Sequence, residues 1–427
     1  MQFPVRILRT RALATLVAVG LAMNVIAGRA EQAKPAPKPA PKPASPPANT
    51  EKTVRTAFYA LTMTTQPGLL PAPDRRRAGG SIDLLGDGVL VVTAIGDFYR
   101  LAWAANGNTF RAEKLPLSVP FNRPALVKES GAGAAAPFRI IDLLVDERGD
   151  ATRLYVAHHY WDPATKCVTL RVSSTTVPTA GNPAGEWKTL FDSQPCLPVG
   201  KMWPMGEQAD RSGGRLARHE RGILLTVGDH GFDGLEGVDA FPLEPGNNYG
   251  KIVLIDEAGT VTPFSIGHRN QQGLAIDGQG RVWSTEHGPE GGDELNLIVE
   301  GGNYGWPLAS YGAEYGTDNW PFAVNATNHG EYREPAHAFI PSIGISQLIQ
   351  ITSMYLPRWT GDLLISSLQA GRLFRVRLSG DQVIYTESID LSTRIRDLVE
   401  ARDGRIVLWN DDGQVATLAL APATPAK

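Results

Sequence analysis

Charged and amide side chains gather among glycines between Gly267 and Pro307, in the segment GHRNQQGLAIDGQGRVWSTEHGPEGGDELNLIVEGGNYGWP. The segment contains two alternating apolar stretches, 273–277 and 281–285, which predict strands that carry these groups on their loops. Glycines at positions 288, 291, 292, 301 and 302 let the backbone fold tightly and turn its carbonyls inward. Metal or cofactor binding by main-chain atoms requires such a backbone.

A cation site is the first chemistry that this segment suggests. The Gly288–Pro289 step leaves two carbonyls available, and Asp293 and Glu294 supply anionic oxygens nearby. Hard oxygen ligands of this kind suit calcium, although their spacing is not that of an EF-hand. The alternative is that all four residues serve only as turn and strand-cap residues.

Composition excludes several classes of protein. The 427 residues carry a net charge of -3 with scattered lysines and arginines, so we expect no nucleic-acid partner. A content of 45 glycines and 32 prolines favours many short strands and turns.

The N-terminus resembles an export signal. Arg6, Arg9 and Arg11 precede an apolar run over 12–27, and Gly28-Arg29-Ala30 offers a cleavage site. We therefore expect a signal peptide at 1–30, or an uncleaved anchor as the only membrane contact, and a periplasmic or secreted location. A Pro/Ala/Lys-rich linker follows at 31–52, and 53–427 is expected to form a single domain.

The chain contains two cysteines, Cys167 and Cys196. In an exported chain the pair suits a disulfide that closes a modest loop. Two buried free thiols are the alternative.

Short apolar runs bounded by Asp, Gly and Asn turns recur along the chain without long helical periodicity. Units such as LAIDGQGRVWSTE and LVEARDGRIVLWND repeat at roughly 40 to 60 residues, a spacing that suits antiparallel blades arranged radially. The sequence predicts an all-β fold, a six-bladed β-propeller of four-stranded antiparallel blades, with a pair of β-sandwiches as the alternative. The expected blade starts are residues 83, 139, 214, 270, 342 and 394.

The motifs GHRNQQGLA, EHGPEGGDELN and GGNYGWP, in this order, resemble the signature of the soluble quinoprotein glucose dehydrogenases, also called glucose/sorbosone or aldose sugar dehydrogenases. Weaker similarity runs from Phe138 to Leu418. The resemblance implies a six-bladed propeller that binds pyrroloquinoline quinone and calcium at one end of its channel. It also implies hydride transfer from a sugar or alcohol to the quinone, which passes its electrons to an unknown acceptor.

The resemblance also implies roles for individual residues. It places Arg269, Asn270, Asp293, Arg394 and Arg396 at the quinone, where guanidinium groups suit carboxylates. The carbonyls of Gly288 and Pro289 match ligands of the cofactor-bound calcium. Glu294 and the carbonyl of Tyr304 match a second, structural calcium site.

Two positions and one segment depart from the family pattern. The GQ-GLLG-type segment that supplies another contact in the family is not recognisable before Asp142, where the sequence reads APFRIIDLLVD. Arg211 stands where the family places the histidine that accepts the substrate proton, and a guanidinium cannot serve as that base. Gln369 stands in place of a cofactor-binding lysine. His230, expected near the channel mouth, is a substitute base candidate, and a packed or exposed loop histidine is its alternative reading. The two hypotheses are therefore a quinone- and calcium-dependent sugar dehydrogenase and a catalytically impaired, calcium-stabilised module that binds protein or glycan.

Overall fold

The computed structural model describes residues 48–71, 79–134, 138–179, 182–198, 211–235, 240–324 and 328–422. The expected signal peptide and most of the expected linker lie outside the described residues. Within them, no helix is both long and apolar enough to cross a membrane.

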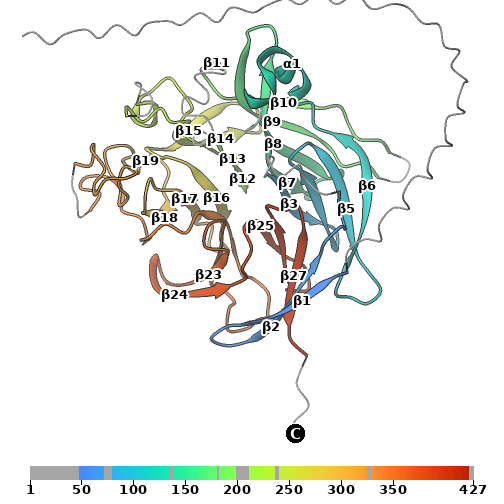
Figure 1. Ribbon diagram of the computed structural model, residues 1–427. Coiled ribbons are helices and arrows are strands. Elements are labelled where there is room, and N and C mark those ends of the chain that lie inside the picture. The colour runs from blue at the N-terminus through green and yellow to red at the C-terminus, as the bar shows by residue number, and fades with distance from the viewer. Residues whose placement is uncertain are drawn as a thin grey trace, which may run out of the picture. The chain divides into compact units, whose positions relative to one another are not determined.

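Six antiparallel sheets form a ring, which confirms the predicted β-propeller (Figure 1). The first blade consists of β3 (Gly80–Leu85), β4 (Gly88–Thr93), β5 (Asp97–Trp103) and β6 (Phe110–Ser118). The second consists of β7 (Ile140–Asp146), β8 (Arg153–Asp162), β9 (Cys167–Thr176), β10 (Lys188–Asp192) and the short β11 (Leu197–Pro198). The third consists of β12 (Gly213–His219), β13 (Gly222–Val227), β14 (Lys251–Asp256), β15 (Val261–Ile266) and the parallel β19 (Gly302–Asn303).

The fourth and fifth blades have four strands each, and the sixth joins both ends of the described chain. The fourth consists of β16 (Gln271–Ile276), β17 (Val282–Glu286), β18 (Asp293–Ile298) and β20 (His337–Phe339). The fifth consists of β21 (Ile345–Gln350), β22 (Leu363–Ser367), β23 (Arg372–Ser379) and β24 (Gln382–Asp390). The sixth consists of β25 (Ile395–Glu400), β26 (Ile406–Asn410), β27 (Val415–Leu420), β2 (Ala60–Gln66) and β1 (Thr50–Arg55). Of the described residues, Arg123–Ala134 form the helix α1 and Phe241–Leu243 a 3₁₀ turn, both in connections.

The first strand of each blade lies next to the first strands of its two neighbours, from β3 through β7, β12, β16, β21 and β25 back to β3. These strands begin at residues 80, 140, 213, 271, 345 and 395, within three residues of the predicted starts. The β2–β27 pairing links the N-terminal hairpin to the last blade by backbone hydrogen bonds. This pairing closes the ring by joining both ends of the described chain in one sheet, in which β1 is the outer edge strand.

The apolar core lies between the blades. Trp283, Leu295, Ile345 and Leu363, for example, form one buried cluster from the facing sheets of the fourth and fifth blades. Inner strands such as β13 and β22 therefore bury both faces, which explains why they read as continuous apolar runs, whereas outer strands such as β6 and β24 expose many residues.

A buried polar network joins four of the first strands. The guanidinium of Arg215 lies 2.9 Å from Asp142 and 3.3 Å from Asp397, and Ser81 donates to both carboxylates. Burial raises the pKa of Asp142 to about 6. Because these residues come from β12, β7, β25 and β3, the network fixes the blades relative to one another.

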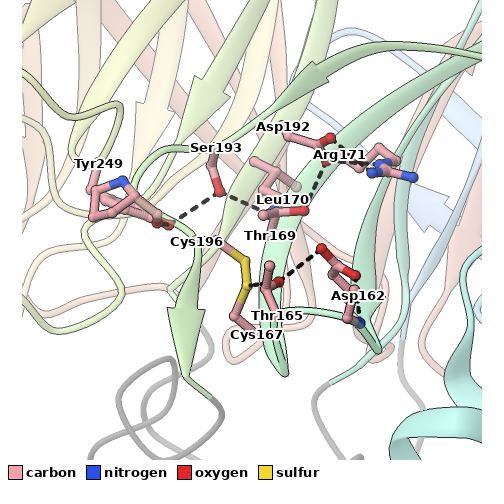
Figure 2. Close-up of a disulfide and its surroundings, with 12 residues drawn as sticks. Asp162, Thr165, Cys167, Thr169, Leu170, Arg171, Asp192, Ser193, Cys196 and Tyr249 are labelled. Atoms are coloured by element: carbon pink, nitrogen blue, oxygen red, sulfur yellow. Dashed lines mark hydrogen bonds and ion pairs between the residues drawn. A yellow bond between two sulfur atoms is a disulfide. The ribbon is translucent and has the colours of Figure 1, made fainter.

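Cys167 and Cys196 form a disulfide with a Cα–Cα distance of 5.7 Å (Figure 2). The bond joins the start of β9 to the segment that leads into β11, next to Thr165, whose hydroxyl lies 2.9 Å from the sulfur of Cys167. The structure thus selects the disulfide over the pair of free thiols.

Candidate functional site

Loops that precede four of the first strands meet at one end of the ring and line a cavity of about 540 Å³. Arg211 and Asn270 come just before β12 and β16, and Gly344 and Arg394 just before β21 and β25. The cavity therefore collects side chains from four blades. Its other lining residues are Arg269, His287, Gly288, Pro289, Glu290, Gly291, Asp293, Tyr315, Pro341, Ser342, Leu368 and Gln369.

Arg269 is held in place from two sides. Its backbone N–H donates to the carboxylate of Glu286, which also accepts a hydrogen bond from His268 at 2.9 Å. Its Nη1 donates to the carbonyl oxygen of Gly288 at 2.7 Å, and its guanidinium lies 5.3 Å from the ring centroid of Trp306. These contacts keep a buried cation at the cavity wall.

The turn after β17 requires glycine at position 288. A side chain there would bring Cβ within 2.3 Å of the Gly291 carbonyl oxygen and 2.4 Å of that of Gly292. The carboxylate of Asp293 fixes the turn, because it accepts from the N–H of Gly288 at 3.1 Å and from that of Ile345 at 2.9 Å. Asp293 lines the cavity, and its contacts anchor the turn to the fifth blade.

The chemistry of the lining groups fits a polyanionic quinone with a bound calcium ion. Arg269 and Arg394 offer guanidinium groups for carboxylates, and Asn270 adds an amide. Gly288 and Pro289 line the same cavity, and main-chain oxygens there would suit a hard cation. The Gly288 oxygen accepts from Arg269 at 2.7 Å, so a bound cation would have to replace or share this hydrogen bond. The assignment of these residues to a cofactor stays a prediction.

Arg394 and Arg396 have different surroundings although both pair with Asp411. Arg394 lines the cavity and lies 2.8 Å from this carboxylate. Arg396 lies 2.9 Å from it, is buried, and is not among the lining residues. Burial lowers the pKa of Arg396 below its ordinary value. The structure therefore brings the first arginine, and not the second, to the cavity.

Arg211, at the family's base position, is part of a buried ionic network. Its Nη1 lies 3.1 Å from Asp233 and 3.7 Å from Asp229, and all three side chains are at most 5% exposed. Asp229 also accepts a hydrogen bond from the indole of Trp306 at 2.8 Å. Burial raises the pKa of Asp229 to about 6, even though Arg211 acts to lower it. Arg211 reaches the cavity as a cation and cannot accept a proton there.

His230 does not line the cavity. It is fully buried, packs edge-on against Tyr249 with ring centroids 5.3 Å apart, and has no hydrogen-bond partner for either ring nitrogen among the described residues. Burial lowers its pKa to about 3. The structure thus places it in a packed interior and not at the channel mouth.

His287 is the histidine that the structure brings to the cavity wall. Its Nδ1 lies 3.8 Å from Asp293, and burial lowers the pKa of the imidazole below its ordinary value. Its place in the sequence, directly before Gly288 in the EHGPEGG motif, is the signal that could have identified it.

Glu294 and Tyr304 border a separate small space of about 10 Å³ with Glu286 and Arg269. Glu294 lies 3.3 Å from Nε2 of His329 and accepts from the amide of Asn296 at 3.1 Å. Among the described residues, no three His, Cys, Asp or Glu side chains are grouped as metal ligands. The carboxylate that the resemblance assigns to a second calcium is thus paired with His329 in this structure.

Comparisons with known proteins agree with this geometry. The aldose sugar dehydrogenase of Escherichia coli is 29% identical over 249 residues, which are 56% of this chain and 64% of that protein. Quinoprotein glucose dehydrogenase B of Acinetobacter calcoaceticus is 24% identical over 320 residues, 54% of this chain and 66% of that protein. The chain thus spans slightly less than two thirds of the length of these relatives.

The fold also matches solved structures. The PQQ-bound aldose sugar dehydrogenase of Streptomyces coelicolor has a TM-score of 0.57 and 21% identity, and the match covers 88% of this chain and all of that one. The family model described as glucose / sorbosone dehydrogenase matches residues 140–418, which is well over half of the chain. The chain therefore belongs to the glucose/sorbosone dehydrogenase family.

Proposed function

We propose that this protein is an exported sugar dehydrogenase that uses pyrroloquinoline quinone and calcium. The observation that carries the proposal is the single cavity that combines Arg269, Asn270 and Arg394 with the main-chain turn at Gly288 and Pro289. The quinone-dependent relatives support the cofactor. Export rests on the leader at 1–30 alone.

The arginines and Asn270 would hold the quinone's carboxylates and reactive edge, and the carbonyls of Gly288 and Pro289 would hold calcium against it. When bound, the quinone would supply a hydride acceptor, with calcium polarising its carbonyl. Because the guanidinium of Arg211 cannot take the substrate's hydroxyl proton, another group must do so. Besides Asp293, the cavity is lined by two side chains that can accept a proton, the imidazole of His287 and the carboxylate of Glu290. Asp293 is already occupied by its anchoring hydrogen bonds.

The test is a cofactor titration of the purified protein with calcium present, followed by dye reduction with a panel of aldoses. We expect micromolar or tighter quinone binding and sugar-dependent reduction. Arg394→Ala, which removes a cation from the wall, should weaken quinone binding about tenfold. Arg372→Ala is the matched control, because this arginine lies at the start of β23 and does not line the cavity. Absence of quinone binding at micromolar concentrations would refute the proposal.

A second function is favoured by Arg211 specifically. Its buried pairing with Asp229 and Asp233 makes the base position permanently cationic, which suits a propeller that binds a glycan or protein without oxidising it. Quinone binding without dye reduction by any sugar would support this alternative.

A further inference from the structure

A groove of about 480 Å³ lies at the end of the ring opposite the cavity. β16 and β21 begin at the cavity, whereas Gln279 and Arg281, beyond the end of β16, and Gln350, at the end of β21, line the groove. Each of these strands has six residues and therefore spans roughly 20 Å. The groove is thus separate from the cavity, and its volume is typical of small-molecule sites, which measure about 300–1,000 Å³.

The carboxylates around the groove are already paired with arginines. Arg281 lies 2.7 Å from Asp277 and 3.0 Å from Asp381, and Arg377 lies 2.9 Å from Asp362. The other ion pairs beside the groove join the buried Arg375 to Asp362 and Glu387. No carboxylate of this set is left without an arginine, so none remains to attract a cation into the groove.

Arg358 is the lining arginine that has no acidic partner. Within the described part of the chain its guanidinium pairs with no carboxylate, and it lies 5.2 Å from the ring centroid of Phe58. Its backbone is held on both sides, because its N–H donates to the hydroxyl of Tyr59 at 2.9 Å and its carbonyl accepts from Arg377. The residue therefore presents an uncompensated cation from a fixed position.

The hydrogen-bonding groups that the groove leaves unused are mostly donors. Arg281 uses Nε and Nη1, and Arg377 uses Nε and Nη2, so the described residues leave one terminal nitrogen of each without a partner. Both oxygens of Asp362 already accept from arginines. Because a guanidinium only donates, these groups together with Arg358 suit a ligand that is rich in acceptors, such as a carboxylate with neighbouring hydroxyls.

One wall of the groove is aromatic. Phe58 lines the groove and is 39% exposed, next to Pro357 and Leu378, which also line it. The face of an aromatic ring carries partial negative charge and attracts the polarised C–H groups on one face of a pyranose. An apolar wall beside a free guanidinium therefore suits a ring that carries both C–H groups and a carboxylate.

We propose that this groove binds a carboxylated sugar chain, such as a uronate oligomer, with a carboxylate on Arg358 and a pyranose ring against Phe58. The free nitrogens of Arg281 and Arg377 would donate to its hydroxyl oxygens. The groove does not depend on the proposed function, because it lies at the other end of the ring. It would attach the protein to an acidic polysaccharide and leave the cavity open.

Calorimetric titration of the full chain with trigalacturonate tests the groove. We expect saturable binding that weakens as salt is added, and no binding of the uncharged maltotriose. Arg358→Ala should weaken binding about tenfold or more, and Phe58→Ala about 3- to 10-fold. Arg358→Lys keeps the charge without the planar fork and should give an intermediate affinity. Arg394→Ala, which removes a cation from the cavity at the opposite end, is the matched control and should leave the affinity unchanged.

Both substituted side chains are exposed, so the variants should melt at the temperature of the unchanged protein. Trigalacturonate affinity that survives Arg358→Ala, or that is lost in Arg394→Ala instead, would overturn the assignment to the groove. Binding of triglutamate as tight as that of trigalacturonate would show an acidic-peptide site and would refute the sugar ligand.

Discussion

Removal of the Arg211 guanidinium should destabilise the fold, and the loss should depend on pH. Arg211→Met replaces the cation with an apolar side chain of similar length and leaves Asp229 and Asp233 buried without it. Breaking a buried ion pair in this way costs about 3–5 kcal/mol, because a desolvated charge loses its partner. The described part of the chain spans about 375 residues. For that size, the loss lowers Tm by about 4–6 °C.

The pH dependence follows from Asp229. Its pKa is raised from 3.8 to about 6 in the folded protein, so the folded state binds more protons than the unfolded state between these values. Stability therefore falls as pH rises from about 4 to about 6, by about 3 kcal/mol. Since Arg211 lowers this pKa, its removal raises the pKa further. The variant should lose less stability at pH 5, where Asp229 is protonated, than at pH 8.

Circular dichroism melts at pH 5 and pH 8 measure both effects. Arg221→Met is the matched control, because this arginine pairs with Glu300 at 2.8 Å on the surface. An exposed pair contributes about 0–1 kcal/mol, so Tm should change by about 1 °C or less. A Tm loss below about 1 °C for Arg211→Met, or a larger loss at pH 5 than at pH 8, would show that the network is not a buried ionic one.

Three further changes test the cavity and the fold. Gln369→Lys adds a cation at the cavity wall and should tighten quinone binding about 5- to 10-fold, with a gain that falls as salt is added. Gln382→Lys on β24 is the control in the same titration. An unchanged quinone affinity would contradict electrostatic attraction between the wall and the quinone. Gly288→Ala should reduce calcium-dependent quinone binding at least about 100-fold, because the new Cβ would lie 2.3 Å from the Gly291 carbonyl oxygen. Gly278→Ala is the control and should leave binding unchanged, since the nearest atom to its new Cβ lies at 3.4 Å. Equal effects of the two substitutions would refute the role of the turn. Cys167→Ser should lower the free energy of unfolding by about 3–4 kcal/mol, because it removes a crosslink across 29 residues. The unchanged protein reduced with dithiothreitol should melt at the same temperature as this variant. A variant that melts at the same temperature as the oxidised, unchanged protein would argue against the disulfide.

Much of the fold is readable from the sequence because a propeller is built from local units. Strand, Asp-Gly turn and strand follow one another within each blade, so their period survives in the sequence. Ring closure is different, since it depends on pairing between β2 and β27 from opposite ends of the chain. The sequence assigned residues up to 52 to a linker, whereas β1 begins at Thr50. The β2–β27 pairing spans more than 300 residues and leaves no local pattern in the sequence, whereas β1 pairs only with the adjacent β2.

In the candidate site too, the features set by local sequence could be predicted, and those set by packing could not. The positions of Arg269, Gly288 and Asp293 follow from glycine-rich turns next to predicted strands, and the structure brings these residues together. The direction of His230 does not follow, because its backbone is left-handed at φ 51° and turns the side chain toward Tyr249. A local motif cannot show that reversal, since it shows neither the dihedral angle nor the packing partner.

Arg211 and Gln369 line the same cavity, and this changes the meaning of the two departures from the family pattern. Taken singly, one removes a base and the other removes a cation that faces an anionic quinone. If the resemblance holds at both positions, the wall would lack a lysine on the fifth blade and carry an arginine before the third. Asp229 and Asp233 hold this arginine in a buried position, where an unpaired charge would be costly. The pairing also means that Arg211 brings two carboxylates with it, so its charge does not compensate for the cation missing at Gln369. Proton acceptance is the feature that a guanidinium at this position cannot supply.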